Sequence, residues 1–149
     1  MKPNVQIVRN GHVAVDLVKL VVCAIIFTHG VHRYLYGEIG PLGDALAHFG
    51  FPYPSDQAQL VNLAETGGVL LIALGILVRT MCAVLIVIFA TGIALIHWQL
   101  GFFIIGPGDG GWEFSALLIA CFTAVALDYW PSRERPNNSF KPKPLRGSA

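Results

Sequence analysis

The sequence predicts an all-α fold: an integral membrane four-helix bundle with cytoplasmic termini and a short interfacial helix in the first outer loop. Three observations lead to this prediction. Hydrophobic residues make up 54% and charged residues 13% of the 149 residues, whereas a soluble domain carries about 25% charged residues to cover its surface. The mean hydropathy of +0.61 is that of a chain solvated mainly by lipid. Four apolar stretches, moreover, approach the roughly 20 residues that cross a hydrocarbon core.

These four stretches define the predicted organisation of the chain. They cover residues 17–36, 60–78, 81–98 and 112–130, and they follow a short N-terminal segment, 1–16. Four crossings place both termini in one compartment. Most lysines and arginines then lie on that side and the opposite loops are mainly acidic, so the positive-inside rule assigns the termini to the cytoplasm. Residues 131–149 are polar and proline-rich without apolar periodicity, which predicts a disordered cytoplasmic tail.

The connections between the stretches predict how neighbouring helices are arranged. Only Arg79 and Thr80 join the second stretch to the third, which predicts a tight antiparallel hairpin. The first outer loop contains apolar residues at the i, i+3, i+4, i+7 spacing of one helix face: Leu42, Ala45, Leu46 and Phe49. We therefore expect a short amphipathic helix there, lying on the outer membrane interface and ending at Gly50.

Several classes of function find no support in the sequence. The formal net charge is only +1, so no strongly basic face suggests nucleic-acid binding. The three cysteines are widely spaced in apolar runs, which argues against a disulfide framework or a Cys-x-x-Cys redox pair within the chain. No Gly-rich loop follows a strand, and no Gly-x-Ser-x-Gly motif is present, so phosphate binding and acyl transfer find no support. Because the histidines and glutamates lack a Glu-x-x-His repeat, we predict no metal site.

Ionisable residues inside the apolar stretches are the most informative ones, because each is costly in hydrocarbon unless it is paired or hydrated. Their depths along the predicted helices sort them into two groups. The outer group comes from all four helices and contains the candidates for ligand binding or proton exchange: His29, His32, Arg33, Glu65, His97 and Glu113. The cytoplasmic group balances two acids against two bases and is predicted to be structural: Asp16, Lys19, Arg79 and Asp128.

The outer group predicts a polar pocket. His29, His32 and Arg33 lie at positions i, i+3 and i+4, so we expect them to share one helix face turned toward the bundle axis. If the histidines are neutral, the outer group contains one positive charge, on Arg33, and two negative charges, on Glu65 and Glu113. We hypothesise that one outer histidine takes up a proton near neutral pH, or that a cationic or hydrogen-bonding ligand cancels the excess acid. The alternative is an ion-pair network that only fixes helix register.

Several motifs resemble those of a known family. Three segments carry the resemblance: His29-Gly30-Val31-His32-Arg33, Gly50-Phe51-Pro52, and Ala64-Glu65-Thr66-Gly67-Gly68 running into Leu74-Gly75-Ile76-Leu77-Val78-Arg79. Their order is similar to that of the DoxX family of small four-helix membrane proteins, over about residues 13–128. A Gly-x-x-Lys of the family stands here as Gly30-Val31-His32-Arg33, and its acidic residue early in the last helix is matched by Glu113. The small, polar C-terminus of the family is replaced by Asp128-Tyr129-Trp130-Pro131 and a long tail.

Members of the DoxX family are linked to membrane redox chemistry, including thiosulfate oxidation coupled to quinone and partnership with soluble redox enzymes. The resemblance implies a subunit of a redox system in the bacterial inner membrane, with a quinone-like or small lipophilic ligand in the outer pocket. Glu65 and Glu113 would then be acceptors, Arg33 the charge stabiliser and an outer histidine the proton carrier. The alternative is a non-catalytic membrane scaffold that recruits a partner enzyme. The sequence leaves enzymatic activity, a partner redox protein and the oligomeric state open.

Overall fold

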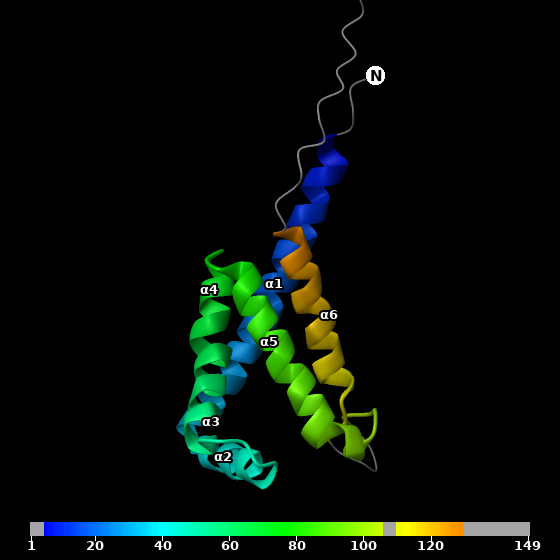
Figure 1. Ribbon diagram of the computed structural model, residues 1–149. Coiled ribbons are helices and arrows are strands. Elements are labelled where there is room, and N and C mark those ends of the chain that lie inside the picture. The colour runs from blue at the N-terminus through cyan, green and yellow to red at the C-terminus, as the bar shows by residue number, and fades with distance from the viewer. Residues whose placement is uncertain (1–4, 106–109, 130–149) are drawn as a thin grey trace, which may run out of the picture.

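The computed structural model describes residues 5–105 and 110–129, and for residues 5–12 it describes the backbone alone. Every regular element in these ranges is helical (Figure 1), which confirms the all-α fold class. In chain order the elements are α1 (Val5–Leu35), α2 (Ile39–His48), α3 (Pro54–Leu63), η1 (Ala64–Gly68), α4 (Val69–Ala73), α5 (Val78–Gly92), η2 (Ile93–His97), η3 (Trp98–Leu100) and α6 (Glu113–Asp128). Two of them, η1 and η2, are π-helical turns. The predicted tail, 131–149, lies outside the described residues.

Within the described residues, successive helical segments alternate in direction (Figure 1). α1 runs from one end of the molecule toward the other, and the uninterrupted run of α3, η1 and α4 returns beside it. α5 then leads away again, and α6 returns along α5. α1 contacts both α4 and α6. The first turns of α1 and the last turn of α6 therefore lie at the same end of the molecule.

Two of these segments are long and apolar enough to cross a membrane. Within the described residues they are Val13–Leu35, the larger part of α1, and Val78–Leu100, which comprises α5, η2 and η3. Only 11% of the most apolar stretch of the second segment is buried inside the protein, whereas the core helix of a soluble protein is mostly buried. Its apolar side chains therefore require lipid or another apolar partner around them.

The other two segments do not meet these criteria of length and composition. α6 has 16 residues, which span about 24 Å and fall short of a hydrocarbon core of about 30 Å. The run of α3, η1 and α4 begins with the polar sequence Pro54-Ser55-Asp56-Gln57, which lowers its hydropathy. By length and composition the structure thus gives two membrane-helix candidates where the sequence predicts four.

The helix boundaries differ from the predicted ones. α1 begins at Val5, so most of the predicted N-terminal segment 1–16 is helical. The second segment begins at Pro54, because proline fits the first turn of a helix, where its missing N–H is not needed. The segment ends before Gly75, whose φ of 78° belongs to the left-handed region. Arg79 and Thr80, the predicted link, therefore lie in the first turn of α5.

α2 is the helix predicted in the first outer loop, but its apolar face turns toward the protein. Gly43 is buried against the start of α3, where a Cβ atom would lie 3.5 Å from Ser55 Cα. The predicted apolar face lines a cavity of the protein: Leu42, Ala45, Leu46 and Phe49. α2 packs against α3 and contributes this face to the cavity; its position at the membrane interface stays a prediction.

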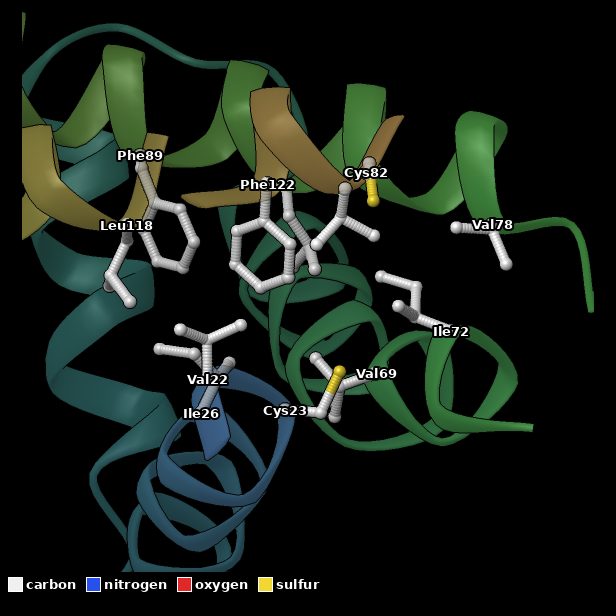
Figure 2. Close-up of a cluster of buried hydrophobic side chains, with 12 residues drawn as sticks. Val22, Cys23, Ile26, Val69, Ile72, Val78, Cys82, Phe89, Leu118 and Phe122 are labelled. Carbon is white, nitrogen blue, oxygen red and sulfur yellow. The ribbon is translucent and has the colours of Figure 1, made fainter. Parts of the chain in front are cut away.

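A core of buried apolar side chains joins α1, α4, α5 and α6, and Figure 2 shows these side chains pointing toward one another. Phe89 of α5 stacks on Phe122 of α6, with ring centroids 6.1 Å apart. The other members are Val22, Cys23 and Ile26 of α1, Val69 and Ile72 of α4, Val78, Cys82 and Leu85 of α5, and Leu118 and Val125 of α6. This core fixes the four segments relative to one another and forms the base of the site described next.

Candidate functional site

The site begins where α1 crosses η1 at very short distance. Gly30 is buried at the crossing, and a Cβ atom there would lie 2.7 Å from Thr66 Cγ2 and 3.4 Å from the backbone carbonyl carbon of Glu65. Cβ atoms do not approach other heavy atoms to 2.7 Å, so any other residue would displace the Thr66 side chain or force the two elements apart. Glycine at position 30 therefore sets the distance between the polar side chains of α1 and η1.

The crossing pairs Arg33 of α1 with Glu65 of η1. Arg33 Nη1 donates to Glu65 Oε2, and Arg33 Nη2 donates to His29 Nε2 over 2.9 Å. The Arg33 side chain is 13% exposed and the Glu65 side chain 4%. Charges this deeply buried persist only with a partner of opposite charge and further hydrogen bonds. The structure thus brings three residues of the predicted outer group together.

Both π-helical turns carry an ionisable residue of this group. Glu65 lies in η1 and His97 lies in η2, and both side chains line the same cavity. A π turn contains one extra residue, which rotates the following side chains by about 100° relative to an α-helix. Such turns are frequent at functional sites because they direct a side chain to a place that α-helical geometry would miss.

The cavity has a volume of about 610 Å³ and is lined by residues of α1, α2, α3, η1, α5, η2, α6 and the loop before α6. Four ionisable side chains of the predicted outer group line it: His29, Arg33, Glu65 and His97. Apolar residues dominate the remaining walls, and Ile26, Phe89 and Leu118 belong both to the cavity and to the core. A mainly apolar cavity of this size with a few convergent polar groups has the character of a small-molecule site.

The charges of the cavity are balanced, because Glu113 does not take part. Glu113 is absent from the cavity lining, and its Oε1 accepts the backbone N–H of Ile104 over 3.0 Å. The cavity therefore contains one base, Arg33, and one acid, Glu65. The predicted excess of acidic residues does not occur in this cavity, because the Glu113 carboxylate binds the backbone of Ile104 instead.

His97 binds the backbone of a second residue of this loop, Gly110. Its Nδ1 donates to the carbonyl of Gly110 over 2.6 Å. Aromatic contacts add to this: Trp98 stacks on Trp112 with centroids 5.8 Å apart, and Phe102 meets Trp112 edge-on at 4.7 Å. Ile104 and Gly110 of this loop both line the cavity, and their backbone groups are held by side chains of η2 and α6.

His32 faces away from the cavity. Its ring stacks on Tyr36 with centroids 4.3 Å apart, and its Nδ1 lies 3.4 Å from Glu38 Oε2 in an exposed contact. The expectation that His32 shares a face with His29 and Arg33 is therefore wrong. The contacts with Tyr36 and Glu38 direct the ring away from the cavity, whose lining does not include His32.

The predicted cytoplasmic group lies at the opposite end of the molecule. Lys19 is 6% exposed, and its Nζ donates to Asp16 Oδ1 over 2.8 Å and to Tyr129 Oη over 2.7 Å. These contacts hold α1 against the residue that follows α6. Arg79 and Asp128 lie at this end too, and each takes part in an interaction.

Most of the cavity lining was not identified from the sequence. Two stripes at i, i+4, i+8 spacing line the cavity, one on α1 and one on α3 and η1: Ile25, His29 and Arg33, and Gln57, Val61 and Glu65. This spacing is the signal that could have identified both helix faces. Among the described residues, no group of three or more His, Cys, Asp or Glu side chains could hold a metal ion.

Comparison with known proteins identifies the family of this chain. No curated protein and no solved structure matches the chain. The family model DoxX matches residues 14–98, which is more than half of the 149 residues. The matched range contains the crossing at Gly30, the Arg33–Glu65 pair and His97. The chain therefore belongs to the DoxX family and is a membrane protein.

Proposed function

We propose that the protein binds a small lipophilic, quinone-like molecule in the cavity beside Arg33 and Glu65 and exchanges protons with it. The observation that supports this is a buried ion pair on the wall of a largely apolar cavity of about 610 Å³. Apolar residues of similar volume would serve packing as well as a buried ion pair does. A ligand with an apolar body and a polar head matches both parts of this surface.

The proposed setting is the bacterial inner membrane, which the chain crosses four times with both termini in the cytoplasm. Four helical segments of alternating direction support this topology (Figure 1). Lys19 and Arg79 lie at the end where α1 begins, as the positive-inside rule requires, and the stacked pair Trp98 and Trp112 lies toward the other end. The short α6 is accommodated by local thinning of the bilayer. The cavity then opens in the outer half of the membrane.

Each polar group of the cavity has a separate role in this function. Glu65 holds the Arg33 guanidinium, which keeps further N–H groups for an oxygen atom of the ligand. A histidine of the cavity exchanges the proton. Reduction of a quinone-like ligand to the quinol takes up two protons and two electrons, and a partner redox protein supplies the electrons; oxidation of the quinol reverses both transfers. The protein then acts as a subunit of a membrane redox system.

Two alanines of α2 offer a matched test. Ala45 lines the cavity, whereas Ala47 is exposed on the same helix and does not line it. The purified protein is loaded with a short-chain benzoquinone in mild detergent, free quinone is removed, and bound quinone per chain is measured by extraction. We expect Ala45→Phe to abolish retention and Ala47→Phe to leave it unchanged. Equal retention by both variants, or none by the wild type, would contradict the proposal.

A non-catalytic scaffold that recruits a partner enzyme is the second candidate. The observation in its favour is a group of exposed apolar side chains after η3: Phe102, Phe103 and Ile105. Capture of a co-purified partner distinguishes the two functions. The scaffold is favoured if Phe103→Ser abolishes capture while Ala45→Phe has no effect on the activity of the captured enzyme.

A further inference from the structure

The hydrogen bonds of the two cavity histidines define where their protons lie. Arg33 carries only N–H donors, so its contact with His29 Nε2 requires a lone pair on that nitrogen. His29 is therefore neutral in this arrangement and carries its proton on Nδ1. A proton on Nε2 would replace the hydrogen bond by a contact between two donors, and the arrangement at Arg33 would be lost.

His97 donates its hydrogen bond, whereas His29 accepts one. The carbonyl of Gly110 can only accept, so His97 Nδ1 carries the proton of their 2.6 Å hydrogen bond. The other nitrogen, Nε2, has no hydrogen-bond partner among the described residues, and His97 lines the cavity. His97 Nε2 can therefore gain a proton without loss of an existing contact, which His29 cannot do.

The charged groups around the cavity leave His97 as its open proton acceptor. α1 contributes Arg33 and the neutral His29, and η1 contributes Glu65, which Arg33 neutralises. Glu113 at the start of α6 accepts the backbone N–H of Ile104. The lining residues of α2 and α3 carry no titratable group. Among the described residues, the cavity thus offers N–H donors at Arg33 and, at His97, a basic nitrogen without a hydrogen-bond partner.

We propose that the ligand is a lipophilic weak acid of the phenol or enol type, and that His97 is the group that takes its proton. This rests on the proposed function of the cavity as a ligand site. The O–H bond of the ligand breaks, an N–H bond forms at His97 Nε2, and no electron is transferred. The resulting oxyanion accepts hydrogen bonds from the remaining N–H groups of Arg33, and both separated charges stay within the same cavity.

A chromophoric probe tests this step. 2-Hexyl-4-nitrophenol absorbs at different wavelengths as phenol and as phenolate, and its methyl ether cannot ionise. At a pH where the free probe is mostly phenol, we expect wild-type protein to bind it as phenolate, with at least about a tenfold higher ionised ratio than free probe. His97→Asn keeps a donor for Gly110 and removes Nε2. It should lower the ionised ratio of bound probe about tenfold and leave binding of the methyl ether unchanged.

Two controls separate the possible failures. His32→Gln removes an exposed histidine outside the cavity and should change neither the binding nor the ionisation of the probe. In wild-type protein labelled with ¹⁵N-histidine, the Nε2 resonance of His97 should shift to that of a protonated nitrogen when the phenol binds. This second readout does not depend on the folding of a variant.

The outcomes distinguish this inference from the proposed function. Bound probe that stays phenolic in the wild type, or an unmoved His97 resonance on binding, would overturn the assignment of His97 and leave the cavity as a ligand site. Failure of both the phenol and its methyl ether to bind the wild type would overturn the proposed function as well.

Discussion

Replacing Gly30 by alanine should destabilise the protein, although alanine is the better helix former. In an unhindered helix the change Gly→Ala stabilises by about 0.5–1 kcal/mol. At position 30 the added Cβ would lie 2.7 Å from Thr66 Cγ2 and 3.3 Å from Glu65 Cβ. Overpacking of this kind costs about 1–3 kcal/mol. The free energy of unfolding should therefore fall by about 1–2 kcal/mol.

The structure also predicts which second change relieves the strain. Thr66→Ser removes Cγ2, the closest atom, and keeps the hydroxyl that donates to the Asn62 carbonyl over 2.8 Å. In the double variant the new methyl group of residue 30 occupies the space that Cγ2 vacates. The contact with Glu65 Cβ remains, so we expect recovery to within about 1 kcal/mol of the wild type.

Denaturant titration in mild detergent, followed by far-ultraviolet circular dichroism, measures these differences. Gly92→Ala is the matched control, because the atom nearest to its added Cβ would be His97 Cδ2 at 3.9 Å. That variant should be as stable as the wild type or more stable. If Gly30→Ala is also as stable as the wild type, the helices do not cross as closely as the geometry requires and the account of the site is wrong.

Three further changes test the polar contacts, each by unfolding in detergent. Glu65→Leu leaves the buried Arg33 without its partner and should lower the free energy of unfolding by about 3–5 kcal/mol. The double variant with Arg33→Met should lose much less. Equal losses in the single and the double variant would show that the pair is not buried. Tyr129→Phe removes one of the two acceptors of Lys19 and should cost about 1–3 kcal/mol, and no change would mean that water replaces the hydroxyl. Asn62 Oδ1 is buried without a partner among the described residues, so Asn62→Leu should be neutral or stabilising by about 1 kcal/mol, and a clear loss would reveal a missing partner.

Residue chemistry predicted that Arg33 is set against the glutamates of other helices, and the structure pairs it with Glu65 and not with Glu113. Arg33 and Glu65 lie in apolar segments and have opposite signs, and each is costly there unless the other neutralises it. The same reasoning applied to Asp16 and Lys19, which stand three residues apart and form the observed 2.8 Å contact. Composition alone likewise predicted helices, because apolar surroundings leave the backbone few other ways to satisfy its N–H and carbonyl groups.

The helix boundaries and the direction of some side chains could not be predicted in this way. The turn between α4 and α5 places both Gly75 and Leu77 at positive φ, 78° and 50°. Leucine seldom adopts this conformation, so the residue type gives no sign of it. His32 was assigned to the cavity by its spacing from His29, but spacing does not distinguish the centre of a helix face from its edge. Contacts with Tyr36 and Glu38 decide its orientation.

The two π-helical turns could not be predicted from the sequence pattern, although both contribute residues to the site. η1 contains Gly67 and Gly68, and η2 directly follows Gly92, and glycine weakens the α-helix at these points. Weak helix propensity alone does not explain why both turns lie at one cavity. Each turn directs an ionisable side chain, Glu65 or His97, into the same apolar space. A bundle that needed only fixed helix register could use α-helices throughout, so the two π turns are better explained by the chemistry of the cavity than by packing.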